Sequence, residues 1–395
     1  MSYIGKTPTS VPLTSSDITD GIITTTKIAD ANVTNPKLTS GSQKNFRNII
    51  INGDMSIAQR GTSFTSVTSN TYTLDRWLTS GTGYTLTITQ DTDVPTGQGF
   101  AKSNKLQVTT ANTSPSAGQS LQYQTRLEGQ MLQYLKFGTS SAESLTMCFW
   151  VKSNLTGVYC TEFQNDDNDK TRGANFTISS ADTWEKKTIT ISGDTASGFT
   201  NDNNRSMRLS FGLMSGSNTT GSNASIANWV TRSTNVTSIF PNLGVNFCSS
   251  TSNYINITGV QLEAGTTASD FEFLPFDVNR QRCYRYYRTL VPLNTENTGF
   301  SMGFYTANNN GRFAMHLENP MRTTPTLDIV TGTDYFKIFT AGGGDDELNS
   351  FSIMANSTER FVIANNTSQA SGTGGQAGYV QSSSNSAYLG LEAEL

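Results

Sequence analysis

The sequence predicts an all-β protein. Of its 395 residues only 15% are charged, against about 25% in an average soluble domain. The polar surface is built instead from Ser, Thr, Asn and Gly, including 34 glycines, and these residues suit pleated strands and tight turns better than helices. Many short segments also alternate apolar and polar residues with a period of two, which is typical of strands that bury one face.

The chain divides into three predicted segments. Residues 1–44 form an extended N-terminal stalk, residues 45–279 a jelly-roll β-sandwich, and residues 280–395 a smaller C-terminal β-sandwich. We expect the stalk to anchor the chain to a larger particle, because it has repeats but no aromatic recognition surface. The C-terminal sandwich would then lie at the distal end.

The stalk prediction depends on a repeat of five residues. Its large apolar residues are Leu13, Ile18, Ile23, Ile28, Val33 and Leu38. Neither a helix nor a flat strand places this spacing on one face, and so polar a segment cannot bury a core alone. We therefore expect an extended segment that packs in register against identical chains, as a parallel homotrimer. A partner surface on another protein, or a disordered linker, is the alternative.

Alternation within the central segment predicts individual strands, among them LTMCFWV (145–151), MRLSFGL (207–213) and LGVNF (243–247). In YINITGVQLEAG the apolar parity switches at Gly259, which predicts a bulge or bend. Helix is expected only in short pieces near Glu128–Lys136 and Asn279–Tyr287.

Charge and cysteine usage exclude several classes of function. A net charge of −4 and a pI of about 5.2 lack the basic bias with which proteins neutralise phosphates, so no nucleic acid is expected. No apolar run is long enough for a membrane-spanning helix, so no membrane insertion is expected. The four cysteines show neither CxxC spacing nor a nearby histidine, so we expect no zinc site and no cofactor. Cys148, in the strand-like run LTMCFWV, is expected to be a buried or half-buried thiol, and disulfides remain possible.

Three groups are candidates for binding. Trp229 stands in the polar stretch SNASIANWVTRS and, if exposed, could stack on a sugar. Asp167 and Asp169, in NDDNDKTRG, are a weak calcium candidate, with a solvated turn as the alternative. Tyrosines interleaved with arginines in RQRCYRYYR (280–288) suit a packed connector or a subunit contact better than an anion site.

Catalysis is not expected. The single histidine, His316, lies near no nucleophile signature, and a Ser-His-Asp or Cys-His site would need it. A glycosidase needs only two carboxylates about 5–10 Å apart, so a hydrolase remains the enzyme alternative.

Several segments resemble one family. The runs NIIINGDMSIAQRGTSF and YTLDRW, between Asn48 and Trp77, resemble the start of a jelly-roll domain of bacteriophage tail-fibre proteins, a domain that is similar to carbohydrate-binding modules. SLTMCFWVKSN, TWEKKTITISGDT and the block from Ile257 to Tyr287 resemble its later strands. The repeat of five resembles trimeric fibre stalks, and the ending EAEL resembles a C-terminal strand of such fibres.

The resemblance implies a trimeric tail fibre on the virion surface. Its N-terminus would attach to a tail or adaptor protein, and its body would bind a glycan or protein on the host. The alternatives are a head-fibre or decoration protein of the capsid and a capsular polysaccharide depolymerase.

Overall fold

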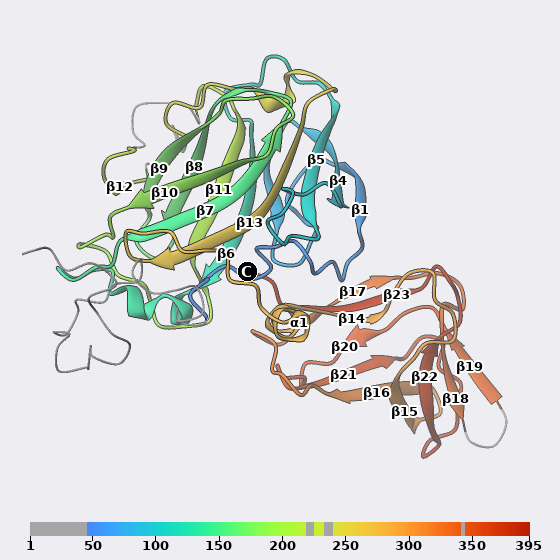
Figure 1. The fold of residues 1–395 in the computed structure, drawn as a ribbon. Coiled ribbons are helices and arrows are strands. Elements are labelled where there is room, and N and C mark those ends of the chain that lie inside the picture. Colours follow the sequence, from blue (N-terminus) through green and yellow to red (C-terminus); the bar gives the residue numbers. More distant parts are fainter. Residues whose placement is uncertain (1–45, 219–224, 233–239, 341–343) are drawn as a thin grey trace, which may run out of the picture. The chain divides into compact units, whose positions relative to one another are not determined.

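The computed structural model describes residues 46–395 except 219–224, 233–239 and 341–343 (Figure 1). The predicted stalk residues, Leu13 to Leu38, lie outside the described residues, as does the trimer contact expected there. Residues 46–395 form one compact unit. Its elements are almost all strands, so the all-β prediction is confirmed.

Two sheets form the first sandwich. One has the strand order β1-β4-β5-β13-β7-β10 and consists of β1 (Ser63–Val67), β4 (Thr85–Asp91), β5 (Ser103–Thr110), β13 (Tyr254–Ala264), β7 (Leu145–Ser153) and β10 (Glu185–Ile191). The other has the order β12-β9-β8-β11-β6-β3-β2 and consists of β12 (Val230–Thr231), β9 (Lys170–Ile178), β8 (Gly157–Asn165), β11 (Arg205–Ser215), β6 (Ser120–Glu128), β3 (Leu78–Thr82) and β2 (Thr71–Tyr72).

Aromatic rings fill the space between these sheets. Phe149 of β7 meets Phe211 of β11 edge to face, with 5.0 Å between ring centroids. Trp77 stacks on Tyr123 of β6 at 5.0 Å, and all four rings are buried. The alternation that predicted β7 and β11 therefore has its expected cause, because the apolar parity of each strand faces a common core.

The second sandwich pairs a small sheet with a large one. The small sheet has the order β14-β23-β17, with β14 (Tyr287–Val291), β23 (Tyr388–Glu392) and β17 (Thr326–Val330). The large sheet has the order β19-β18-β22-β15-β16-β21-β20, with β19 (Gly344–Leu348), β18 (Phe336–Thr340), β22 (Ala377–Ser382), β15 (Gly299–Ala307), β16 (Asn310–His316), β21 (Phe361–Asn366) and β20 (Ser352–Ile353). A separate buried cluster, which includes Phe313, Phe336 and Leu391, forms its core.

Among the described residues helix is confined to short pieces, as predicted, although their form differs. α1 (Phe276–Tyr284) joins the sandwiches, and the predicted domain boundary at 279/280 lies inside it. The helix expected over Glu128–Lys136 is two 3-10 turns, η5 (Gly129–Met131) and η6 (Gln133–Leu135). It ends at Lys136, whose φ of 55° is left-handed and stops a helix.

Two further predictions have opposite outcomes. The bulge at Gly259 is confirmed, because the register of β13 with β7 shifts between Thr258 and Gln261 and Gly259 has a φ of 63°. The strand predicted at LGVNF is wrong. Its end is the 3-10 turn η7 (Phe247–Ser249), because the Asn246 side chain accepts a hydrogen bond from the Cys248 amide and so caps a turn.

No helix among the described residues is long and apolar enough to cross a membrane. The four cysteines are free and buried, which confirms the burial expected for Cys148.

Candidate functional site

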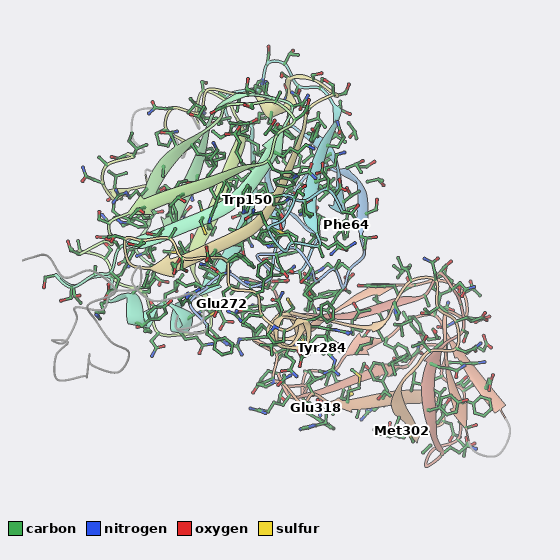
Figure 2. All side chains as sticks on the ribbon, in the orientation of Figure 1. Phe64, Trp150, Glu272, Tyr284, Met302 and Glu318 are labelled. Carbon is green, nitrogen blue, oxygen red and sulfur yellow. The ribbon has the colours of Figure 1, made fainter. Side chains whose placement is uncertain are left out.

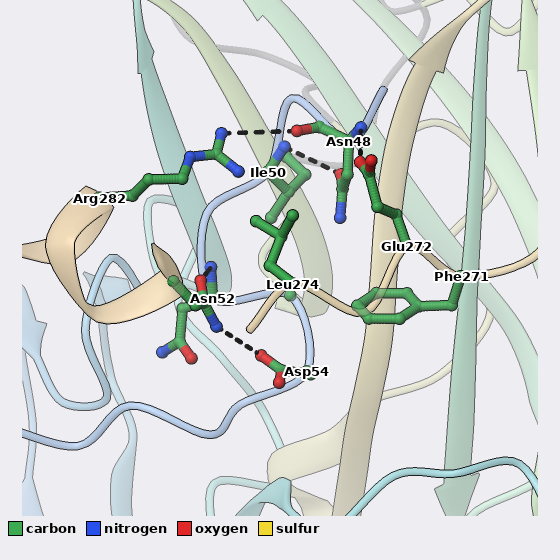
Figure 3. Close-up of a pocket in the computed structure, with 10 residues that line it drawn as sticks. Asn48, Ile50, Asn52, Asp54, Phe271, Glu272, Leu274 and Arg282 are labelled. Carbon is green, nitrogen blue, oxygen red and sulfur yellow. Dashed lines mark hydrogen bonds between the residues drawn. The ribbon is translucent and has the colours of Figure 1, made fainter. Parts of the chain in front are cut away.

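Two of the segments that carry the resemblance, the one that starts at Asn48 and the block Ile257–Tyr287, meet in space at a polar junction (Figure 3). The side chain of Asn48 donates to the carbonyl of Val260 at 3.1 Å and accepts from the amide of Leu262 at 3.1 Å. Glu272 accepts from the Asn48 amide at 2.9 Å. The cavity at this junction has a volume of about 10 Å³, which holds at most about one water molecule. It is therefore not a ligand site.

The same junction holds the start of the jelly roll against α1. Asn279 of α1 accepts from the Asn52 amide at 3.2 Å and donates to Asp54 at 3.0 Å. The Trp77 indole N–H donates to the Asn52 carbonyl at 3.0 Å. The motif NIIINGD (48–54) thus provides hydrogen-bond partners for buried backbone groups. Its role in this structure is to stabilise the fold.

Within the tyrosine–arginine connector Cys283, Tyr286 and Tyr287 are fully buried, in keeping with a packed connector. The Tyr286 ring lies 3.5 Å from the Arg76 guanidinium and the Tyr287 ring 3.5 Å from that of Arg60. Arg76 also pairs with Glu394, and Arg60 lies 3.3 Å from the same carboxylate. Burial disfavours the charge on Arg76, yet Glu394 raises its pKa above the ordinary value.

Glu128 gives this connector a dependence on pH. Burial disfavours its charged form, but hydrogen bonds from Arg285, at 2.7 Å, and Tyr286 outweigh that effect and hold the pKa of Glu128 below its ordinary value. A lowered folded-state pKa stabilises the protein above the unfolded pKa of about 4.3. That stabilisation is lost as the pH falls through the folded-state value.

We therefore expect Glu128→Gln to lower the free energy of unfolding by about 1.5–3 kcal/mol at pH 7. The difference from the unaltered protein should shrink below about pH 4.3. Urea unfolding of both proteins between pH 7 and pH 3 measures it. A difference that stays constant over this range would contradict the assignment.

A second group of polar residues lies on the outer face of the seven-stranded sheet of the first sandwich. Cross-strand register aligns Gln124 of β6 with Ser210 of β11, and Ser210 with Glu162 of β8. These positions alternate with core residues such as Tyr123, so their side chains point away from the core. The polar face, as defined here, consists of Gln122, Gln124, Arg126, Glu162, Gln164, Thr171, Arg208 and Ser210.

The polar face carries hydrogen-bonding groups without partners. Gln124 is fully buried, yet among the described residues neither its side-chain nitrogen nor its oxygen has a partner. The same holds for the Ser210 hydroxyl, the Gln164 oxygen and the Arg126 Nε. Leaving a buried polar group unpaired costs about 1–3 kcal/mol of stability. The presence of several such groups on adjacent strands of one face therefore needs a physical explanation.

Described residues of the segment after β12 cover one part of this sheet. The Phe240 ring packs on Cys160, and a Cβ at Gly212 would lie 2.4 Å from that ring. Pro241 lies in the same way over Gly173. At the rim Arg208 pairs with Asp166 at 2.6 Å. Burial raises the pKa of Glu162, against the opposing influence of Arg232 and of a hydrogen bond from Thr171.

Trp229 directly precedes Val230, which pairs with Thr171 of the polar face, but the contacts of the Trp229 ring lie elsewhere. Trp229 is half-buried, donates to the Ser192 carbonyl at 2.9 Å, and meets Phe137 edge to face at 5.6 Å. Its proposed role in ligand binding stays a prediction. The sequence did not identify the polar face. Its residues alternate with apolar ones, and such alternation normally indicates that the polar side of a strand faces solvent.

Asp167 and Asp169 lie in the turn between β8 and β9. Asp167 accepts from the Thr200 amide at 2.8 Å, and Asp169 has a φ of 51°. Within the part of the chain that the structure describes, no group of three or more His, Cys, Asp or Glu side chains is placed to hold a metal ion. His316 is exposed at the end of β16.

A third surface lies on the C-terminal sandwich. Phe339 of β18, Tyr379 of β22 and Met302 of β15 are cross-strand neighbours on the outer face of the large sheet (Met302 is labelled in Figure 2). Their exposed fractions are 43%, 41% and 66%. Exposed apolar rows of this kind mark contact surfaces more often than chance.

Comparison with known proteins gives matches at the level of structure. No family model matches the chain, and no curated protein matches it. Solved structures that resemble it include the enzymatically active domain of tailspike protein 4 of bacteriophage CBA120, at 14% identity and a TM-score of 0.30. That match covers 55% of this chain and 21% of the tailspike chain, so it spans about a fifth of that protein.

Carbohydrate-binding modules are also among the similar structures. TmCBM61 in complex with β-1,4-galactotriose matches at 10% identity and a TM-score of 0.29, over 55% of this chain and 99% of the module. The CBM22-1–GH10 modules of Clostridium thermocellum xylanase 10B, complexed with xylohexaose, match at 11% identity and a TM-score of 0.28, over 56% of this chain and 29% of that one. At such identities the likeness concerns the fold alone.

Proposed function

We propose that the chain is a non-enzymatic fibre protein of a bacteriophage particle, a homotrimer that attaches to a glycan on the host surface through the polar face. The glycan assignment rests on the amide of Gln124, the hydroxyl of Ser210 and the amide oxygen of Gln164, which have no partner among the described residues. A glutamine amide donates and accepts at once, so it can bind two neighbouring sugar hydroxyls. These groups are buried in this structure, so a polyhydroxylated ligand supplies the partners that they lack only once the segments that cover this face have moved aside.

The place on the virion rests on the family resemblance and on the stalk repeat. Residues 1–44 would anchor the trimer to a tail or adaptor protein, with a capsid fibre or decoration protein as the alternative location. Deletion of residues 1–44 is expected to abolish incorporation into particles. Light scattering of the full chain is expected to give a trimer mass that Ile18→Asp, Ile23→Asp and Ile28→Asp together reduce.

Gln124→Leu tests the polar face. The substitution removes two unpartnered polar atoms at nearly constant volume, so the free energy of unfolding should stay equal or rise. Retention of the protein on host cells or on their purified polysaccharide should fall at least tenfold. Binding measured by sedimentation, together with urea unfolding of the same variant, separates ligand contact from folding.

Two comparisons sharpen this experiment. Tyr379→Ser alters the exposed apolar row of the C-terminal sandwich and is expected to leave glycan retention unchanged. If Tyr379→Ser abolishes retention and Gln124→Leu does not, the host contact lies on the C-terminal sandwich and the polar-face assignment is wrong. Release of reducing sugar from the polysaccharide by the unaltered protein would instead support the depolymerase alternative.

A further inference from the structure

Three exposed phenylalanines lie near the start of the compact body, which consists of residues 46–395. Phe46, Phe273 and Phe276 have exposed fractions of 65%, 49% and 59%. They are called the collar below. Each is a large apolar side chain left in water, at a cost that burial would recover.

The collar residues are held by rigid parts of the body. The Phe46 amide donates to Glu272, the residue before Phe273. The Phe273 ring packs against Phe100 and Phe271, at 5.0 Å and 4.9 Å between ring centroids. Phe276 begins α1, and residues of α1 contact the segment after Phe46, as when Arg282 donates to the Asn48 carbonyl at 3.5 Å. The collar is therefore a fixed surface around the point of entry.

The chain is fixed within a few residues of the start of the body. Asn48 is 4% exposed and fixed by three hydrogen bonds of its side chain. Only residues 46 and 47 lie between it and residue 45, and these three steps along the chain reach at most about 10 Å. If three stalks meet on one axis, the surface around Phe46 of every copy must lie close to that axis.

We infer that the collar is a contact between copies of this chain, in which Phe46, Phe273 and Phe276 of each body pack against those of its neighbours at the base of the stalk. The inference rests on the trimer proposed above. Three phenylalanines at these exposures offer roughly 350 Å² per copy, given about 150–250 Å² for a whole aromatic side chain. That area is well below the about 800 Å² per partner of a standard interface, so the contact needs the tether. Tethered bodies meet at effective concentrations of about millimolar.

Cross-linking of the full chain tests this contact. Phe46→Cys and Phe276→Cys each add one exposed thiol, and the four native thiols are buried. Burial also raises the pKa of Cys148 to about 11 and of Cys248 to about 12, which keeps them unreactive. A short bis-maleimide should join chains of both variants into covalent dimers.

Ser252→Cys is the matched control. Ser252 is exposed and precedes β13, whose other end carries Glu263, 3.8 Å from Arg47. The length of this strand puts Ser252 about 30 Å from the collar, so it should not cross-link. Light scattering runs in parallel on each variant.

Cross-linking and light scattering together distinguish three outcomes. A trimer mass with cross-linking of Phe46→Cys and Phe276→Cys but not of Ser252→Cys supports the collar contact. A trimer mass without cross-links at the collar overturns the contact and leaves the trimer standing, with the collar then free for another virion protein. A monomer mass overturns both the trimer and the collar.

Discussion

Glu394→Ala is expected to lower the free energy of unfolding by about 3–5 kcal/mol, because it leaves a buried charge unpaired. The Glu394 carboxylate is 3% exposed and pairs with Arg76, which is 1% exposed, and with Arg60. A guanidinium cannot lose its proton to escape the cost of burial. Without Glu394, Arg76 keeps the Tyr286 ring and the Arg126 carbonyl as neighbours, but no ion-pair partner within the described part of the chain. Urea unfolding of the full chain measures the loss.

Glu392→Ala is the matched control two residues earlier. Its side chain is 35% exposed and lies 3.4 Å from Arg60 only, so the expected cost is under about 1 kcal/mol. Arg76→Met combined with Glu394→Leu should recover much of the stability, since apolar replacements of a buried pair are often neutral or better. Equal losses for Glu394→Ala and Glu392→Ala would show that the buried pair does not stabilise the body.

Trp77→Ala is expected to cost about 3–5 kcal/mol as well, for a different reason. The Trp77 ring is fully buried and stacks on Tyr123, and its N–H donates to the Asn52 carbonyl. Removing the ring leaves a cavity in the first sandwich and an unpaired acceptor in the junction beside it. The loss should appear as a lower urea midpoint with an unchanged slope.

Two other substitutions separate these contributions. Trp77→Phe keeps most of the apolar volume but loses the hydrogen bond, so a cost of about 1–3 kcal/mol is expected. Trp184→Ala removes a half-buried ring whose N–H donates to Asp93 at 2.9 Å, and it should cost less than either. If Trp184→Ala costs as much as Trp77→Ala, the core assignment of Trp77 fails.

The sequence predicted the strands whose two faces differ most in polarity. β7 and β11 were found because Phe149 and Phe211 mark one buried side. The strand predicted at LGVNF does not form, although apolar and polar residues alternate there. A local hydrogen bond from the Cys248 amide to Asn246 competes with strand pairing. Alternation reports which residues share a face, and it is blind to such local capping.

Burial of the polar face was beyond the reach of the sequence. In LQYQTRL the glutamines alternate with Leu121, Tyr123 and Thr125, which suggests that they lie on a solvent-facing side of the strand. Whether something covers that side depends on chain segments far away, such as the one that places Phe240 on Gly212. The pairing of Arg76 with Glu394 was hidden for the same reason, because no local pattern joins residues 318 positions apart.

That separation has a consequence for synthesis. The ribosome adds about 5–20 residues per second, so Arg76 waits roughly 15–65 s before Glu394 has been added. During that interval the nascent first sandwich holds a guanidinium whose carboxylate partner does not yet exist, and β23 is missing from the sheet that it later completes. Prematurely terminated chains would keep this defect permanently. Because such chains are less stable, proteases would degrade them more readily than complete chains.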